Sequence, residues 1–248
     1  MYWSSDADIM TRRQPADETS KCQFGTLGFV FVSYPIQLDS IGSKAVRCQS
    51  SRSDRHPDDM TVDRDLQRIS RTLEVLNQSG YYYEGVSWQK AADLLKNTSV
   101  GTFLVRPSSD SKYLFALSVQ TDRGPTSVRI HYLRGQFRLD SEDCVAHLMP
   151  LFDCVVQLVE YYVQLTRSVK ASSCVLVDGS GRRDVPIRLC RPLYRHVRSL
   201  QHLCRLRVNG QLVESRKVPS NQALATDVRK LDLPNSVKSF LREYPYVH

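Results

Sequence analysis

The first sustained helical pattern in the chain covers residues 62–77. Its apolar side chains recur at offsets of three and four, which places four of them on one face of a helix: Leu66, Ile69, Leu73 and Leu76. Gly80 follows and ends the pattern. We therefore predict an amphipathic helix that packs this face against the body of the protein.

An α+β domain is predicted directly after this helix. Ser87 is a suitable N-cap for a helix with one apolar face, made of Trp88, Ala91, Ala92 and Leu95. Apolar runs separated by turns then indicate four strands, at residues 103–105, 113–121, 127–132 and 136–140. A second helix begins near the cap Asp153, with helical spacing of Val155, Leu158, Val159 and Tyr162. The pattern predicts a central antiparallel sheet flanked by two helices.

The flanking segments lack this regularity. Residues 1–61 are rich in Ser, Asp, Arg and Pro without periodicity, which predicts a poorly ordered region. An apolar stretch at residues 24–41 interrupts it and fits a short strand, a partner-binding segment or an aggregation-prone stretch covered by the fold. Residues 166–187 contain several Gly and Pro breakers and predict a loop.

Two short helices are predicted near the C-terminus. The first begins at the cap Ser199 and ends at Asn209-Gly210, with one stripe formed by Leu200, Leu203, Cys204 and Val208. The second is capped by Asn235 or Ser236 and ends at Pro245, and its apolar residues are Val237, Phe240, Leu241 and Tyr244. Helices this short bury little surface by themselves, so each stripe belongs either to a core or to a partner surface.

Arg106 carries the strongest chemical signal. It ends the apolar run at residues 103–105, and a charged side chain rooted in a core strand requires an anionic partner. The hydroxyls of Ser108 and Ser109 and the backbone N–H groups of the turn through Lys112 are positioned to meet the same anion. Because a guanidinium group binds two phosphate oxygens at once, we predict a phosphate site here.

Composition narrows the class of protein. A chain of 248 residues, 41% hydrophobic and 24% charged, suits one or two globular domains. Its start lacks the layout of a secretory signal, and the apolar run at residues 27–36 is far short of the roughly 20 residues that span a bilayer. Seven cysteines without a C-x-x-C pair fit reduced thiols. We therefore expect a cytoplasmic protein.

The net charge of +8 admits two interpretations. Nucleic acid or an anionic membrane would attract a basic chain. The basic residues are scattered, however, which fits solvated surfaces and an acidic phosphorylated ligand, since phosphotyrosine brings about −1.5 to −2 charges. Sequence signatures of kinases, of serine hydrolases and of cysteine nucleophiles are missing, and His196, His202 and Cys204 lack a fourth ligand at metal spacing. We expect no enzyme activity, no cofactor and no metal.

The string GTFLVR followed by Ser-Ser resembles the signature of the Src-homology-2 (SH2) domain, the phosphotyrosine-binding module. The resemblance implies that Arg106 grips the phosphate, assisted by Ser108, Ser109 and Arg129. Selection of the residues after the phosphotyrosine is implied for the 166–187 loop and the surface around residues 132–148. Pro107 replaces the usual acidic residue and Ala116 a threonine, and both changes are expected to weaken the pocket.

The C-terminal stripe resembles the elongin-binding motif of the SOCS box. The residues implied to contact elongin C are Leu200, which inserts into a pocket, with Leu203, Cys204 and Val208. The segment Leu231-Asp232-Leu233-Pro234 resembles the element that selects a cullin, with Leu231, Leu233 and Pro234 matching and Asp232 in place of the usual proline. That replacement leaves the preference for a cullin less secure than elongin binding.

Together these features resemble the suppressor of cytokine signalling family over residues 62–248. The strings GPTSVRIHY, FRLDS and SLQHLCRL are most similar to the branch of the cytokine-inducible SH2 protein and suppressor of cytokine signalling two. The implied division is an N-terminal region at 1–61, an extension helix at 62–80, an SH2 domain at 81–187 and an all-helical SOCS box at 188–248. The segment before the helix does not resemble the kinase-inhibitory segment of other branches.

The resemblance implies a negative regulator of cytokine receptor and JAK-STAT signalling. Such an adaptor binds phosphotyrosine on activated cytokine or growth-factor receptors and recruits elongin B, elongin C, a cullin (cullin five) and a RING subunit for ubiquitination. The alternative is a competitive blocker that occupies receptor phosphotyrosines without ubiquitin transfer.

Overall fold

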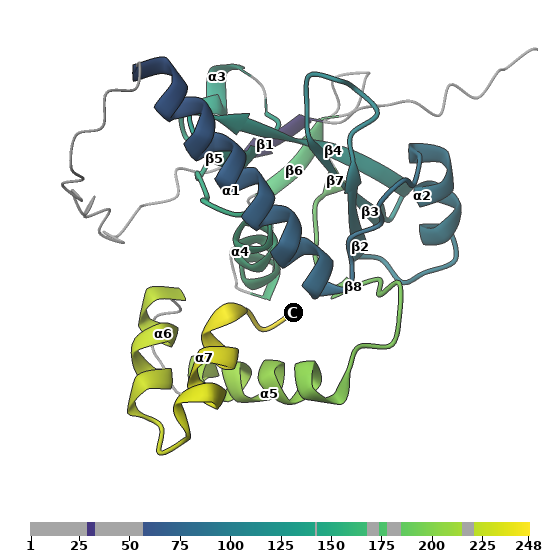
Figure 1. Cartoon of the computed structure of the whole chain (residues 1–248). Helices are drawn as coiled ribbons and strands as arrows, with labels where there is room; N and C mark the ends of the chain where they lie inside the picture. Colours follow the sequence, from purple (N-terminus) through teal and green to yellow (C-terminus); the bar gives the residue numbers. More distant parts are fainter. Residues whose placement is uncertain (1–28, 33–56, 142, 168–173, 178–184, 215–220) are drawn as a thin grey trace, which may run out of the picture.

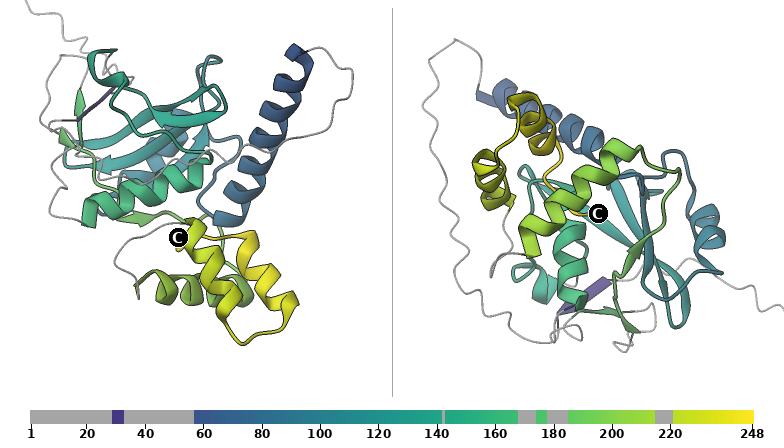
Figure 2. Two further views of the ribbon diagram at one scale, coloured as in Figure 1. Left: turned by 90° about the vertical axis from the view of Figure 1, so that its left-hand side faces the viewer. Right: turned by 90° about the horizontal axis from the view of Figure 1, so that it is seen from below.

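The computed structural model describes residues 29–32, 57–141, 143–167, 174–177, 185–214 and 221–248. Its body is a five-stranded sheet with helices on both faces, and a group of three helices lies beside this body (Figure 1). The C-terminus lies between the body and the three helices, as the views in Figure 2 also show. The predicted α+β class, with a helix before the domain and a helical C-terminal region, is confirmed.

The main sheet has the strand order β5-β4-β3-β2-β8. Strands β2 to β5 are antiparallel neighbours, whereas β8 pairs in parallel with β2. The strands are β2 (Thr102–Pro107), β3 (Phe115–Thr121), β4 (Gly124–Leu133), β5 (Gln136–Leu139) and β8 (Arg191–Pro192). The sequence pattern predicts the first four but not β8, because a two-residue strand carries no periodicity. The sheet therefore continues beyond residue 187.

Alternate residues of β2 face opposite sides of the sheet. Phe103 and Val105 pack in the larger core with helix α4 (Val155–Arg167), and Leu104 packs in a smaller core with helix α2 (Trp88–Leu95). Ser87 caps α2 as predicted, because its hydroxyl accepts a hydrogen bond from the Lys90 amide at 3.3 Å. The same alternation directs Arg106 to the face of the sheet that α2 covers.

Helix α1 (Pro57–Ser79) is longer than the predicted helix, but a smaller part of it than predicted packs against the body of the protein. Leu76 is fully buried, but Leu66 is 59% exposed, so the predicted apolar face is wrong for the first turns. A hydrogen bond from the Tyr132 hydroxyl to the Asp65 carboxylate, 2.8 Å long, anchors this half instead. Burial, with Asp65 nearby, raises the pKa of Tyr132 to about 12. Gly80, with φ +78°, ends the helix as predicted.

The predicted cap of α4 is also wrong. The helix begins at Val155, and the Asp153 carboxylate accepts hydrogen bonds from Arg68 at 3.3 Å and Gln136 at 3.4 Å. Asp153 thus helps to hold α1 and β5 together. A one-turn helix, α3 (Asp143–Ala146), precedes this segment and is not predicted by the sequence pattern.

A second, three-stranded sheet joins the N-terminal region to the predicted loop. Its strands are β1 (Phe29–Val32), β6 (Cys174–Val177) and β7 (Val185–Pro186), in the order β1-β6-β7. The prediction of a loop over residues 166–187 is therefore wrong where β6 and β7 lie. Of the three alternatives for residues 24–41, the structure contains the short strand. The predicted poor order of residues 1–61 otherwise falls on residues outside the described ones, except for the start of α1.

The C-terminal group consists of α5 (Leu200–Glu214), α6 (Asn221–Lys230) and α7 (Asn235–Glu243). Ser199 caps α5 as predicted, accepting a hydrogen bond from the His202 amide at 3.2 Å. The predicted stop at Asn209-Gly210 is wrong, since α5 continues through both residues. The predicted caps of α7 are also wrong, because Pro234 holds the cap position and makes no side-chain hydrogen bond there.

The last residues of the chain fasten this group to the body. Asn209 is buried, and its side-chain amide donates to the carbonyl oxygens of Tyr244 at 2.8 Å and Tyr246 at 3.0 Å. From the body, the Glu160 carboxylate on α4 accepts the amides of Val247 at 2.9 Å and His248 at 2.8 Å. Helix α5 does not end at Asn209. The side-chain amide of this residue is buried and already bonded to these two carbonyl oxygens, so it does not act as a helix stop.

Arg205 makes a second connection between the helical group and the body. Its Nη1 donates to the Phe240 carbonyl at 2.9 Å, and its Nη2 donates to the Gln78 side chain of α1 at 3.2 Å. Nη2 also lies 2.9 Å from Nδ1 of His202, which must accept and is therefore unprotonated. Burial, followed by the Arg205 and Arg198 charges, lowers the pKa of His202 to about 4.

We predict that His202 makes the protein less stable in acid. An unfolded histidine titrates near 6.5, so between pH 6.5 and 4 the unfolded chain binds a proton that the folded chain does not, and stability falls as the pH falls through this window. His202→Gln should reduce the slope of unfolding free energy against pH, measured by chemical denaturation. The exposed His147, changed to Gln, is the control and should keep the wild-type slope. Equal slopes in all three proteins would contradict the prediction.

Candidate functional site

Arg106 lies at the end of β2 and is only 2% exposed. Its guanidinium group donates to four acceptors, all without charge: Ser118 Oγ at 3.1 Å, the Pro107 carbonyl at 2.9 Å, Ser109 Oγ at 3.3 Å and Ser127 Oγ at 3.3 Å. Burial lowers the pKa of Arg106 from its ordinary value. The positive charge is buried with neutral partners, an arrangement that an incoming anion would complete.

The strand register explains why these side chains meet. Arg106 pairs with Ala116 on β3, and Ala116 pairs with Arg129 on β4, so the three residues form one row across the sheet. Ser118 and Ser127 form the next paired row, and their hydroxyl oxygens lie 2.8 Å apart. Side chains paired directly across antiparallel strands point to the same face. Ala116 thus leaves a methyl group, without a hydroxyl, between the two arginines.

Ser118 and Ser127 are not predicted by the sequence as parts of the site. A serine inside a strand carries no signal of its own, and only the register of β3 and β4 brings these two to Arg106. The useful signal is the alternation of β3, which puts Ser118 on the face of Ala116 rather than that of Leu117.

The loop between β2 and β3 is closed by its own hydrogen bonds. Ser109 contacts Arg106, whereas the Ser108 hydroxyl accepts from the Asp110 amide at 3.1 Å. The Lys112 amide donates to the Asp110 carboxylate at 3.1 Å. The expectation that the N–H groups up to Lys112 converge on one point is therefore not met in this structure, because two of them bond within the loop.

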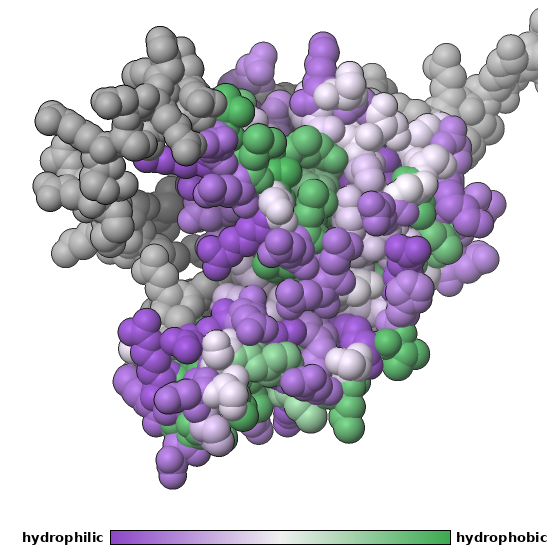
Figure 3. Space-filling view, in the orientation of Figure 1, coloured by the Kyte–Doolittle hydropathy of each residue, from purple (hydrophilic) through white to green (hydrophobic). Residues whose placement is uncertain are grey.

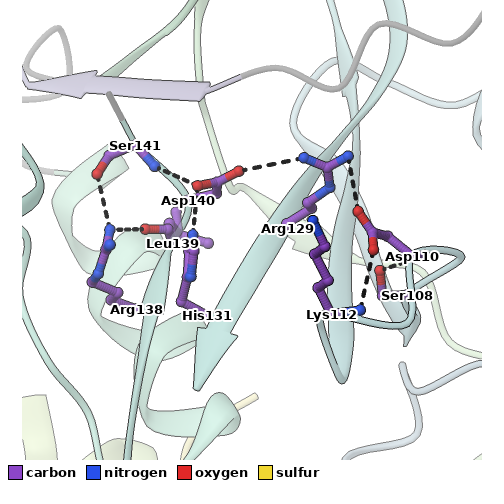
Figure 4. Close-up of polar contacts among 9 residues, drawn as sticks. All are labelled: Ser108, Asp110, Lys112, Arg129, His131, Arg138, Leu139, Asp140 and Ser141. Carbon is purple, nitrogen blue, oxygen red and sulfur yellow. Dashed lines mark hydrogen bonds and ion pairs between the residues drawn. The ribbon is translucent and has the colours of Figure 1, made fainter. Parts of the chain in front are cut away.

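Arg129 has different surroundings from Arg106. Figure 4 shows it between two carboxylates, Asp110 of the loop and Asp140 after β5. The distances are 3.3 Å from Nη2 to Asp110 and 3.9 Å from Nη1 to Asp140. Its guanidinium carbon also lies 4.9 Å from the centre of the Tyr113 ring. The structure thus brings Arg129 to the row of Arg106 but pairs it with acids.

A second candidate surface lies on α5, away from the sheet. Leu200 is 76% exposed, Leu203 and Cys204 are exposed, and Val208 is half-buried. Val197, just before the helix, is 98% exposed and is missed by the sequence analysis because it precedes the helical pattern. Figure 3 shows hydrophobic side chains at the lower edge of the molecule, at the start of α5. Exposed apolar side chains gathered on one helix indicate a partner surface.

The remaining predicted residues lie between α6 and α7. Leu233 and Pro234 are exposed and Leu231 is half-buried, and the Leu233 amide donates to the Leu231 carbonyl at 3.0 Å. The segment forms a tight exposed turn next to Asp232.

The described part of the chain contains neither a metal-ligand cluster nor a membrane-spanning helix. No three His, Cys, Asp or Glu side chains in them are grouped closely enough to hold a metal ion. None of the helices in this part of the chain is long and apolar enough to cross a membrane.

Comparison with known proteins accounts for both surfaces. Residues 81–162 match the SH2 domain, and residues 196–242 match the SOCS box. Suppressor of cytokine signaling 2 from Rattus norvegicus is 37% identical over 179 residues, which cover 72% of this chain and 82% of that protein. The cytokine-inducible SH2-containing protein from Bos taurus is 34% identical over 233 residues, covering 87% of each chain.

The chain belongs to the suppressor of cytokine signaling family. Within it, the similarity to these two relatives places the chain near their branch, as the sequence motifs predict. Its SH2 domain contains the Arg106 site and its SOCS box contains the exposed stripe of α5. The family and the two domains identify a phosphotyrosine-binding regulator that suppresses cytokine signalling.

We predict that the unneutralised charge of Arg106 costs stability. Arg106→Met keeps most of the side-chain volume and removes the buried charge, so the free energy of unfolding should rise by about 1–2 kcal/mol. Thermal unfolding monitored by circular dichroism would measure the change. Lys90→Met on the exposed side of α2 is the control for adding a methionine and should leave the melting temperature unchanged. A lower melting temperature for Arg106→Met would contradict the prediction.

Proposed function

We propose that this protein is a non-catalytic adaptor that joins tyrosine-phosphorylated cytokine or growth-factor receptors to a ubiquitin ligase. Arg106, Ser108, Ser109 and Arg129 bind the phosphotyrosine, with Ser118 and Ser127 as additional members of the site. Leu200, Leu203, Cys204 and Val208 bind elongin C in complex with elongin B. Leu231, Leu233 and Pro234 select the cullin, which is cullin five with its RING subunit. The complex acts in the cytoplasm and lowers JAK-STAT signalling by degrading the bound receptor or its partners.

The observation that carries this proposal is the buried guanidinium of Arg106. A phosphate supplies two negative charges and three acceptor oxygens, so it can replace the neutral acceptors around Arg106 with charge-assisted hydrogen bonds. The Ser118 hydroxyl accepts a hydrogen bond from Nε of Arg106, and this contact fixes the plane of the guanidinium group. The Nη atoms of Arg106 donate to Ser109 Oγ and Ser127 Oγ, both at 3.3 Å. A phosphate would take over these two Nη donors from the weaker hydroxyl acceptors.

The second part of the proposal rests on the orientation of α5. Asn209 and Arg205 face the body and make the internal contacts, while Leu200 and Cys204 face away from it. A partner can therefore cover the exposed stripe without disturbing the contacts that hold the SOCS box to the SH2 domain. Receptor and ligase are then held at fixed positions on one protein, which raises the effective concentration of one at the other.

A competitive blocker is the alternative function. Occupation of the receptor phosphotyrosine by the Arg106 site would exclude other phosphotyrosine-binding proteins without ubiquitin transfer. The two functions share the SH2 domain and differ only in their need for α5, which makes them separable by substitution.

We predict that Arg106→Lys abolishes phosphopeptide binding and preserves the fold. Lysine keeps a positive charge but cannot form the bidentate pair with phosphate, so affinity should fall at least about a hundredfold. Arrays of phosphotyrosine peptides from cytokine and growth-factor receptors, probed with the chain co-expressed with elongins B and C, would measure the loss and identify candidate receptors. Arg123→Lys, in the exposed turn between β3 and β4, is the matched control and should bind normally. Near-normal binding by folded Arg106→Lys would exclude the proposed pocket.

We predict that the double change Leu200→Ala and Cys204→Ala abolishes elongin binding without loss of stability, because both side chains are exposed. Co-purification with elongins B and C would measure binding. Leu148→Ala and Leu151→Ala change other exposed leucines and should have no effect. Measuring the suppression of receptor signalling in cells then separates the two proposed functions. If the protein is an adaptor, the double variant no longer suppresses signalling, whereas a competitive blocker still does.

A further inference from the structure

We infer that Asp110 occupies Arg129 in the unliganded protein and competes with the phosphate for it, so that this one loop carboxylate limits the affinity of the site. The inference rests on the proposed phosphotyrosine-binding function and adds a residue that sets its strength. Asp110 Oδ2 lies 3.3 Å from Arg129 Nη2, and Figure 4 shows the two side chains facing each other.

The charge of Arg129 is already balanced before any ligand arrives. Asp140, on the other side of the guanidinium group, is buried and fixed by two short contacts. Its Oδ1 lies 2.6 Å from His131 Nε2 and accepts the Ser141 amide at 3.1 Å. Asp110, in contrast, belongs to a loop, and a third of its side chain is exposed. Of the two carboxylates, Asp110 is therefore the one that can move away.

The position of Arg129 gives it a role in phosphate binding only if Asp110 moves. Arg106 and Arg129 lie two strands apart in the same row, about 10 Å between their backbones, with only the Ala116 methyl group between them. A phosphate on Arg106 is thus within reach of the long Arg129 side chain. If Asp110 stayed in place, its carboxylate would face a dianion, which is unfavourable.

Arg129 also has unused hydrogen-bonding capacity. Its Nε is buried and has no hydrogen-bond partner among the residues that the structure describes. Rotation of the guanidinium group from Asp110 toward a phosphate would change the surroundings of this atom while Asp140 keeps the other side anchored. The two carboxylates on either side of Arg129 in Figure 4 are therefore one fixed acid, Asp140, and one movable acid, Asp110.

The charge of Asp110 can be removed without losing the shape of the loop. Its Oδ1 accepts the Lys112 amide at 3.1 Å, and its own amide donates to Ser108 Oγ at 3.1 Å. The amide oxygen of asparagine can accept the same Lys112 hydrogen bond. Asp110→Asn therefore tests the charge alone.

The experiment is a titration of the full chain with N-acetylphosphotyrosine amide, which carries the phosphate and ring but no neighbouring residues. Asp110→Asn should lower the dissociation constant about three- to tenfold, because a half-buried ion pair and a repulsion are removed together. Asp122→Asn is the control: it makes the same charge change in the exposed turn at the far end of β3, roughly 20 Å away and beyond the screening length. This control should bind like the wild type.

A double-mutant cycle with Arg129→Gln decides whether Asp110 acts through Arg129. In that background the gain from Asp110→Asn should largely disappear. An equal gain with and without Arg129 would overturn the inference, because Asp110 would then act only as a general negative charge. Unchanged or weaker binding by Asp110→Asn would also overturn it while leaving the proposed function intact. Failure of the wild type to bind the probe at all would instead count against the phosphotyrosine site itself.

Discussion

The burial of one guanidinium group is the constraint around which the SH2 domain is built. Arg106 lies near the end of β2, paired with Ala116 of β3, and is only 2% exposed, so its charge is held away from solvent. The fold surrounds it with hydroxyl groups, which satisfy its donors but not its charge. A protein that keeps such a group gives up stability for a site already arranged to receive an anion.

A second constraint is the attachment of the SOCS box to this domain. Leu206, Tyr244 and Tyr246 belong to the same hydrophobic core cluster as the SH2 domain. Polar contacts add to this packing: Glu160 holds the last two amides of the chain, and Arg205 joins α5 to α1 and α7. Buried polar contacts of this kind specify one arrangement, because any shift leaves donors or acceptors unpaired. The apolar residues at the start of α5 are not needed for the attachment, which is why they remain exposed.

The sequence predicts those parts of the fold whose signals are periodic or chemically unusual. The four antiparallel strands, the caps Ser87 and Ser199 and the buried Arg106 all follow from patterns within a few residues. Ser118 and Ser127 could not be found in this way, since their role depends on the pairing of β3 with β4. The stop assigned to Asn209-Gly210 failed for a similar reason: the acceptors of Asn209 are carbonyls some 35 residues further along. Local patterns thus predict elements, and contacts distant in sequence decide how the elements end and what they hold.

The two arginines of the site show how one row of a sheet can contain opposite electrostatic arrangements. Arg106 is a buried charge with neutral acceptors, so any suitable anion gains the full interaction with it. Arg129 is paired with Asp110 and Asp140, so an anion that binds it must replace a carboxylate. The anion then gains only the difference between its own interaction energy with Arg129 and that of the carboxylate. A phosphate dianion can exceed a carboxylate in this exchange, whereas an acidic side chain of a peptide cannot. On the proposed function, the pairing therefore favours phosphotyrosine over other acidic groups even while it lowers absolute affinity.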